Sequence, residues 1–510
     1  MAPADLARDR AARRAALATG AAVGVVGLLA LNRFLVGVFY DDGLYAGLAT
    51  ALARGQGYVH PHLPATPAAV HYPPLYPVVL APLFGLLPLG AAAITAKVLN
   101  LLLAAAAAAL LVWHAARRVL IGEAAPPWLY AVIVTAAATA IPVLATQGVL
   151  FAEPLFALLF VATVLVTDDP PARLRPDHAA LLVGSLAALA LLARSIGAAL
   201  GAGAVVYLLW RRRSGLRVAG HAAAPLALAA LGWGAWVTAN QDGIDPALTL
   251  NYGSYFAALG QAGLSAVGAS ARDLPRPLAA LTLGWVPGAV PFVLLALLAG
   301  CVLLTGLVHL ARRSSAGLAL GGYLAILAVW PYRPDRFLWA VLPWLAIAFA
   351  AGVAALWGRR PLRVPVALAV ATVAGGFAQY QVRGLAGRWW EGAARNISAN
   401  FTELLPAVRE LPDSAVVATD DEALVWLYTG RRAVPLYLFS YRGRDTVEPG
   451  PEAQRAYLQR QGATHVLLAA PSGESARQLR ALMAAFPDWL EPVRPWSGGR
   501  WLFAVTAGRP

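Results

Sequence analysis

The chain has 510 residues, of which 59% are hydrophobic and 13% are charged, and its mean hydropathy is +0.62. Soluble globular domains carry about 25% charged residues, so this composition excludes one large water-soluble enzyme. The formal net charge of +14 comes almost entirely from arginine. Arginine beside apolar runs indicates orientation in a membrane, and no RNA- or DNA-binding signature accompanies it, so we expect no nucleic-acid partner.

The first apolar stretch, 15–38, follows four arginines and resembles a signal peptide. It is too long for one and lacks a clear small-residue cleavage site, so we interpret it as a retained first span. The single cysteine, Cys301, lies in another apolar run. It therefore excludes an intrachain disulfide framework and a cysteine metal cluster.

Apolar segments of roughly 18 residues or more recur as far as residue 380. If the arginine clusters between them are cytoplasmic, consecutive clusters must enclose an even number of crossings. The short, proline-rich segment 75–89 is then a surface or re-entrant helix rather than a span. About eleven crossings remain, and they are 15–38, 91–113, 127–146, 151–167, 179–193, 196–210, 218–239, 279–310, 317–330, 337–357 and 364–380.

The predicted fold is a polytopic α-helical membrane protein with a cytoplasmic N-terminus. Residues 1–380 form its transmembrane domain, with a first external loop at 40–74, and residues 381–510 form a small extracytoplasmic α/β domain. In that domain we expect strands at 415–418, 465–469 and 501–505 and helices at 421–428, 451–461 and 474–486. It shows no glycine-rich phosphate loop and no catalytic constellation.

Two carboxylates, Asp41 and Asp42, directly follow the first span. Leucines then repeat every four residues across 43–53, which predicts an amphipathic helix lying along the membrane. An aspartate here could simply cap that helix. Adjacent helical residues point roughly 100° apart, so one aspartate could cap while the other acts as a base or holds an acceptor or metal.

Further charges stand at the external ends of later spans. Glu153 begins one span and is either a capping residue or functional, because a carboxylate at membrane depth is costly. Arg194, between two apolar runs, is an interfacial anchor or an anion site. Arg333 and Arg336 flank Asp335 in a short external turn, where they could form a structural pair with it or hold a phosphate.

Three histidines, His60, His62 and His71, share the first external loop. Histidine and carboxylate both ligate zinc, so a metal site is conceivable. The spacing matches no specific motif, and the sequence leaves the presence of a metal unknown.

Taken in order, these motifs resemble the GT-C superfamily of integral-membrane glycosyltransferases, in particular the group containing protein O-mannosyltransferases and aminoarabinose transferases. The matching segments are Asp41-Asp42 with Tyr45, His71-Tyr72-Pro73-Pro74-Leu75, Glu153-Pro154-Leu155-Phe156, Arg194, and Arg336-Phe337-Leu338 with Pro343. The second acid of the first motif is usually glutamate, whereas here it is Asp42. The resemblance therefore leaves open which aspartate is the base.

The resemblance implies a hexosyl- or pentosyltransferase of the plasma membrane. It would move a sugar from a polyprenyl-phosphate donor to a hydroxyl of a lipid, glycan or protein acceptor on the extracytoplasmic face. A carboxylate base opposite the leaving group would invert the anomeric carbon. The implied roles are Asp41 as base, Asp42 and Glu153 orienting the acceptor or a possible divalent cation, Arg194, Arg333 and Arg336 binding donor phosphate, and Tyr45, His71 and Tyr72 binding substrate.

Two other functions fit a polytopic chain. A transporter or lipid flippase would show internal repeats with broken helices at the midplane, and no such repeats are visible. A membrane-anchored binding protein would use its C-terminal domain and would not need Asp41, Glu153 or Arg194.

Overall fold

The computed structural model describes residues 3–263, 265–442 and 445–506, which form two compact units. The first unit comprises Met1–Leu31, Lys97–Gly234 and Val267–Trp390. The second comprises Asn32–Ala96, Ala235–Ala266 and Glu391–Pro510. Each unit is therefore assembled from three stretches that are far apart in the sequence.

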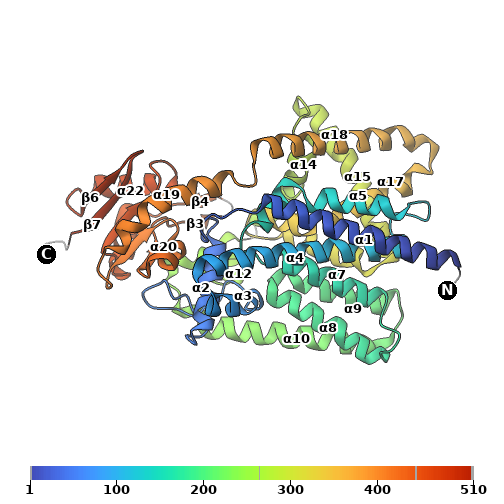
Figure 1. Cartoon of the computed structure of the whole chain (residues 1–510), viewed down its shortest axis with the longest axis horizontal. Helices are drawn as coiled ribbons and strands as arrows, with labels where there is room; N and C mark the ends of the chain where they lie inside the picture. The colour runs from blue at the N-terminus through green and yellow to red at the C-terminus, as the bar shows by residue number, and fades with distance from the viewer. Residues whose placement is uncertain (1–2, 264, 443–444, 507–510) are drawn as a thin grey trace. The chain divides into compact units, whose positions relative to one another are not determined.

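The described part of the first unit is helical (Figure 1). Its helices are α1 (Pro3–Ala30), α4 (Leu89–Arg117), α5 (Pro127–Ala138), α6 (Ile141–Gln147), α7 (Glu153–Asp168), α8 (Pro176–Ala193), α9 (Ala198–Trp210), α10 (Gly215–Asn240), α13 (Ser265–Asp273), α14 (Arg276–Leu283), α15 (Ala289–Arg313), α16 (Ser315–Ala328), α17 (Asp335–Trp357) and α18 (Arg363–Gly387). Short 3-10 turns, η1 (Ser195–Gly197) and η4 (Arg360–Leu362), precede α9 and α18. Helices α4, α10 and α13 have residues in both units.

Seven helices in the described residues are long and apolar enough to cross a bilayer, or eight if the bent pair α5 and α6 counts as one span. A polytopic helical architecture is thereby confirmed, whereas the count of about eleven crossings is not. Two of the predicted spans correspond to shorter apolar helices, Ser195–Trp210 and Ser315–Ala328.

Three predicted spans are interrupted or shortened. Segment 127–146 bends by 67° between α5 and α6, where Pro142 lies in the first turn of α6. Segment 279–310 breaks between α14 and α15, and Pro287 lies in the gap. Proline lacks the N–H that continues a helix, which explains both breaks. The predicted span 15–38 was wrong at its end, because α1 stops at Ala30.

Helices α15 and α17 cross at close range through two glycines. A Cβ at Gly306 would lie 1.7 Å from the carbonyl oxygen of Ala348, and one at Gly352 would lie 2.0 Å from that of Val302. The two backbones therefore touch directly, as small residues allow at helix crossings in membranes. Packing of this kind fixes α17, whose first turn carries a site residue.

The second unit is α/β. Its helices are α2 (Asp41–Ala53), α3 (Leu75–Leu86), α11 (Thr249–Tyr252), α12 (Tyr255–Ala262), α19 (Gly392–Arg409), α20 (Glu422–Thr429), α21 (Pro451–Arg460) and α22 (Glu474–Ala485), with 3-10 turns η2 (Gln241–Gly243) and η3 (Pro246–Leu248). Its strands are β1 (Val416–Thr419), β2 (Arg432–Pro435), β3 (Ser440–Arg442), β4 (Asp445–Val447), β5 (His465–Leu468), β6 (Leu490–Trp496) and β7 (Arg500–Val505).

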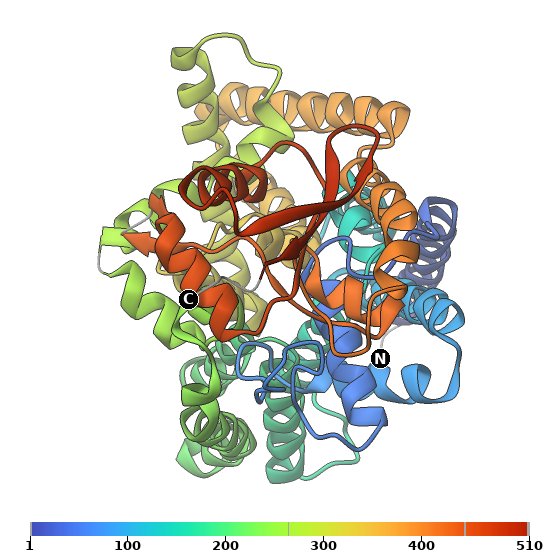
Figure 2. The same ribbon diagram turned by 90° about the vertical axis from the view of Figure 1, so that its left-hand side faces the viewer.

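The main sheet has the order β2-β1-β5-β7-β6, and β3 pairs with β4 separately. Strand β1 runs parallel to β2 and β5, while β7 runs antiparallel to β5 and β6. Figure 2 turns this orange-to-red part of the chain toward the viewer. Each of the three predicted strands and three predicted helices matches an element of this unit to within two residues.

The segment between α1 and α2 contributes to the core of this unit. Val38 packs with Phe401 of α19, Leu424 of α20 and Leu467 of β5. The backbone N–H of Val36 donates to the hydroxyl of Tyr428 at 3.0 Å. The segment before α2 and the C-terminal segment therefore share one hydrophobic core.

Helix α2 corrects a prediction of the sequence. Its residues from Asp42 to Ala51 are all buried, so it is a core helix and not an amphipathic surface helix. The leucine repeat marks one buried face, but glycines and alanines on the other faces let neighbouring segments pack closely there as well. A Cβ at Gly43, for example, would lie 3.2 Å from the Cβ of Ala423 in α20.

Candidate functional site

Three of the predicted charged residues meet in the first unit. The guanidinium of Arg194 forms an ion pair with Oε1 of Glu153, and Nε of Arg336 lies 2.9 Å from the same oxygen. Glu153 is 2% exposed and Arg194 is 6% exposed, whereas Arg336 is partly exposed. Two guanidiniums around one buried carboxylate form a compact cationic cluster.

Each member of this cluster stands at a helix end. Glu153 is the first residue of α7 and is followed by Pro154, which suits the first turn of a helix. Arg194 lies in the break between α8 and η1. Arg336 is the second residue of α17. The sequence therefore uses three helix interruptions to bring these charges together.

Neighbouring side chains hold the cluster in place. The guanidinium of Arg194 lies 4.6 Å from the ring centre of Phe337, and that of Arg336 lies 4.4 Å from the ring centre of Phe151. Cations over aromatic faces are stabilised by the ring quadrupole. The side chain of Asn100 in α4, which the sequence did not single out, donates to the carbonyl of Phe151 at 3.1 Å. These contacts pre-orient both arginines.

Arg333 does not join this group. It is exposed, and in the described part of the chain it forms no ion pair with Glu153. Of the three arginines expected to bind phosphate, the structure therefore brings Arg194 and Arg336 together on Glu153. Arg333 precedes α17, whereas Arg336 lies within its first turn. The helix therefore sets the direction of the Arg336 side chain but not that of Arg333.

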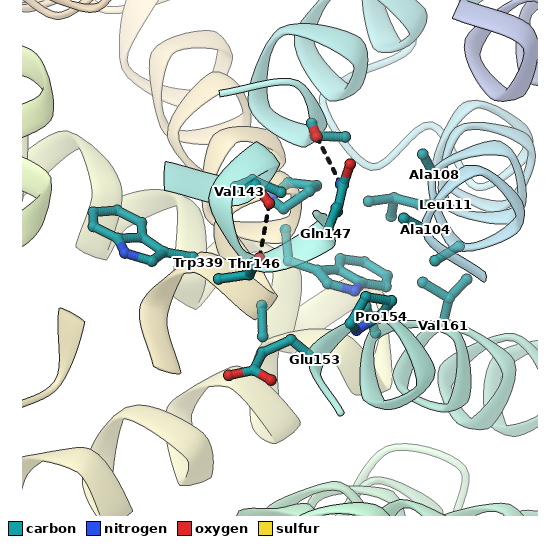
Figure 3. Close-up of a pocket in the computed structure, with 16 residues that line it drawn as sticks. Ala104, Ala108, Leu111, Val143, Thr146, Gln147, Glu153, Pro154, Val161 and Trp339 are labelled. Atoms are coloured by element: carbon teal, nitrogen blue, oxygen red, sulfur yellow. Dashed lines mark hydrogen bonds between the residues drawn. The ribbon is translucent and has the colours of Figure 1, made fainter. Parts of the chain in front are cut away.

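A small cavity of about 50 Å³ lies next to Glu153 (Figure 3). Its walls are mostly alanine, leucine, valine, proline and tryptophan side chains from α4, α7 and α17. Thr146 and Gln147 of α6 add polar groups, and they hydrogen-bond to the carbonyls of Val143 and Ala138. The cluster thus borders apolar space within the helical unit.

The two aspartates of the first loop differ in role. Asp42 is fully buried, and its carboxylate accepts hydrogen bonds of 2.9 Å from the backbone N–H groups of both Gly37 and Phe39. Asp42 therefore shapes the turn that leads into α2, but the N–H groups that it binds precede the helix, so these bonds do not cap α2. Asp41 is the first residue of α2 and is partly exposed.

The aromatic residues that we expected to bind substrate form a packed group in the second unit. The ring of Tyr45 lies 4.8 Å from that of Tyr72, and the ring of His71 lies 4.7 Å from that of Tyr72. All three side chains are buried. Nδ1 of His71 is 2.7 Å from the carbonyl oxygen of Gly253, which ties the first loop to the segment between α11 and α12. These side chains therefore contact one another inside the second unit and do not form an exposed surface.

A second buried polar group was not predicted. Nε2 of His62 lies 2.9 Å from the hydroxyl of Tyr252, and that hydroxyl donates to Oε1 of Glu422. Burial raises the pKa of Glu422 from 4.5 to about 7 and lowers the pKa of His62 to about 3. A run of three acids after a predicted strand, ending in Glu422, was the available signal. Sequence reasoning missed it because the partners come from distant segments.

No group of three or more histidine, cysteine, aspartate or glutamate side chains among the described residues is arranged to hold a metal ion. His60 and His62 lie together, with ring centres 5.6 Å apart, but they join Tyr252 rather than a ligand set. We therefore assign no ligands among the described residues to the possible divalent cation.

The sequence matches no protein-family description and no curated protein. Among solved structures, ArnT from Cupriavidus metallidurans in the apo state matches with a TM-score of 0.51 and 16% identity, over 95% of this chain and 96% of that one. The same protein bound to undecaprenyl phosphate gives a TM-score of 0.49 and 16% identity, over 96% and 97%. The Archaeoglobus fulgidus oligosaccharyltransferase in complex with zinc and sulfate gives 0.50 and 10% identity, over 96% and 73%.

These matches confirm the resemblance at the level of fold. The chain has the fold of two GT-C superfamily members, one an aminoarabinose transferase and the other an oligosaccharyltransferase. Together with the apolar helices, the fold identifies an integral multi-pass membrane protein. Fold alone does not assign an activity, which must be argued from the residues.

Proposed function

We propose that this chain is a membrane glycosyltransferase that moves a sugar from a polyprenyl-phosphate donor to an acceptor hydroxyl on the extracytoplasmic face. The observation that supports this most directly is the convergence of Arg194 and Arg336 on buried Glu153 in a chain with a GT-C fold. The arginine clusters at the opposite helix ends favour a cytoplasmic N-terminus by the positive-inside rule.

The arginine pair suits a departing lipid phosphate. When the bond between the sugar and the phosphate breaks, negative charge increases on the phosphate oxygens. Planar guanidiniums bind such oxygens in pairs, and pre-oriented donors need no rearrangement as the charge develops. We assign Arg194 and Arg336 to the donor phosphate and Arg333 at most to its approach.

Glu153 has a different role in this proposal from the one that the resemblance implied. Because both arginines contact its Oε1, its carboxylate is placed to hold them convergent rather than to orient an acceptor or a cation. Without that carboxylate the two guanidiniums would repel each other, and the side chains would separate.

Asp41 is the better candidate for the base. A base must reach the acceptor hydroxyl and accept its proton as the new glycosidic bond forms. Asp42 is buried and holds two backbone N–H groups, whereas Asp41 is partly exposed on the first turn of α2. Attack by the acceptor from the face opposite the leaving phosphate would give inversion. The sugar could be a hexose or a pentose, and the acceptor a lipid, a glycan or a protein.

The experiment is a transfer assay with purified full-length protein, radiolabelled polyprenyl-phosphate sugars and a cell-envelope extract. We expect label to move into an acceptor fraction, and Arg194→Gln to lower the rate by about 10²-fold or more. Arg173→Gln, which changes an exposed arginine between α7 and α8, is the matched control and should transfer normally.

Two results would count against the proposal. Full activity of a folded Arg194→Gln protein would remove the phosphate assignment. Passage of intact labelled donor across a proteoliposome membrane, with no new glycosidic bond, would instead favour the flippase alternative.

A further inference from the structure

The buried group around Glu422 joins three separate segments of the second unit. His62 belongs to the first loop, Tyr252 to α11 and Glu422 to the first turn of α20. All three are 0% exposed. The hydroxyl proton of Tyr252 goes to Glu422, so a hydrogen bond between His62 and Tyr252 needs a proton on Nε2 of His62. The resulting chain of donors runs from His62 through Tyr252 to Glu422.

Helix α20 also packs directly on the turn that precedes Asp41. A Cβ at Gly37 would lie 2.5 Å from the Cβ of Leu424, so nothing larger than glycine fits between that turn and α20. Gly37 has a φ of 105°, a left-handed conformation that favours glycine. Its N–H is one of the two that Asp42 accepts. A displacement of α20 therefore moves the backbone at Gly37, which leads directly into Asp41 and Asp42.

We propose that Glu422 is a positioning residue for the acidic turn 37–43: its contact with Tyr252 locks α20 against that turn and so fixes the direction of Asp41. This inference rests on the proposed role of Asp41 as base. Glu422 itself touches neither donor nor acceptor in the proposal. It acts through α20, as a latch that joins the C-terminal segment to α11 and to the turn 37–43.

Ionisable groups surround the latch on every side. Those coupled to Glu422 itself are Tyr40, Tyr252, Asp420, Asp421 and Tyr457. Around them, Asp41 acts on Tyr40, Asp42 on Asp421, His62 bonds Tyr252, and His62 and His71 act on His60. They are acids and phenols together with histidines, and burial lowers the pKa of His60 and His62, which keeps both neutral. An ionised Glu422 therefore faces other acids across a buried space.

Burial favours the protonated form of Glu422, although the hydrogen bonds from Tyr252 and Tyr40 favour the carboxylate. Burial raises its pKa to about 7, so the neutral form dominates below that pH and the carboxylate above it. Ionisation puts a charge in a dry site beside Asp420, which disfavours the closed arrangement. Transfer by the native chain is therefore expected to decline as the pH rises through 7.

The test combines hydrogen exchange with kinetics on the full-length protein. Glu422→Ala and Tyr252→Phe, which removes only a hydroxyl, should speed amide exchange in residues 36–43 about tenfold. Glu452→Ala, at an exposed acid of α21, should leave it unchanged. Glu422→Gln keeps an oxygen that accepts from Tyr252 but does not ionise. It should restore slow exchange and a normal kcat at pH 6 while losing the decline in transfer between pH 6 and pH 8.

The failures of the two proposals are distinguishable. If exchange in 36–43 is equally slow in Glu422→Ala, Tyr252→Phe and Glu452→Ala, or if Glu422→Gln declines with pH as the native chain does, the latch is refuted. If Asp41→Asn transfers sugar normally, the proposed base is wrong, whereas an effect of Glu422→Ala on exchange would still stand.

Discussion

Stability against pH offers a direct measurement on Glu422, and it needs no substrate. Because the pKa of Glu422 rises from 4.5 to about 7 on folding, the folded state binds its proton more tightly than the unfolded state does. The contribution of this proton to stability is complete below pH 4.5, declines as the pH rises further and is lost above about 7. At 1.36 kcal/mol for each pKa unit, the loss is at most about 3 kcal/mol.

The comparison is between the native chain and Glu422→Gln, in which the neutral amide cannot titrate. His60 and His62, whose lowered pKa acts on stability in the opposite direction, are present in both proteins and cancel in the difference. At 2–4 °C per kcal/mol for a domain of this size, the native Tm should fall relative to the variant by about 5–10 °C between pH 5 and pH 8.

Tryptophan fluorescence suits this assay, because Trp426 lies in α20 itself. Thermal unfolding of both proteins would be recorded in the same detergent at pH 5, 6, 7 and 8. Parallel Tm curves over that range would show that Glu422 titrates with an ordinary pKa, and the reasoning from burial would then be refuted.

Three further predictions concern other parts of the molecule. Asp41→Asn should abolish transfer with little change in Tm. Asp42→Asn turns an amide donor toward one of the two backbone N–H groups, so it should lower the free energy of unfolding by about 1–3 kcal/mol in a thermal unfolding experiment. The opposite pattern would exchange the roles of the two aspartates. Arg336→Lys keeps the charge but loses the planar fork, so we expect transfer to fall at least tenfold in the radiolabel assay, and a native rate would show that charge alone suffices. Gly306→Ala should lower Tm by an amount equivalent to about 1–3 kcal/mol because its Cβ meets the backbone of α17, while Gly300→Ala on the same helix, where a Cβ meets nothing, should not; equal Tm values would contradict the close crossing.

Local pattern predicted much of the architecture. Apolar runs located the helices of the first unit, and alternation of strand-like and helical segments located β1, β5, β7, α20, α21 and α22. Strand β6 was missed because Pro492 and Pro495 interrupt its pattern, which an edge strand tolerates. Breaks such as the one between α5 and α6 depend on single prolines within long apolar runs, and hydropathy averages over them.

The candidate site, too, could be predicted only in part. Charges at the ends of spans identified Glu153, Arg194 and Arg336, because a buried charge in an apolar sequence stands out locally. The sequence could not show that Glu153 contacts both arginines, since that depends on how α7, α8 and α17 pack. The raised pKa of Glu422 could not be predicted for a similar reason, because it results from burial in a unit built from segments that are distant in the sequence.

The three-part assembly of the second unit has a consequence for biosynthesis. Residues 32–96 are translated early and 235–266 midway, yet the sheet and α20 on which they pack arise only from 391–510. Until the ribosome has made that last stretch, Val38 lacks the residues of α19, α20 and β5 on which it packs and Tyr252 lacks Glu422, and the unfinished unit exposes apolar surface that invites aggregation. A chain that terminates prematurely before Glu422 would retain its apolar helices but leave this unit unfinished, which makes it a ready target for membrane quality control.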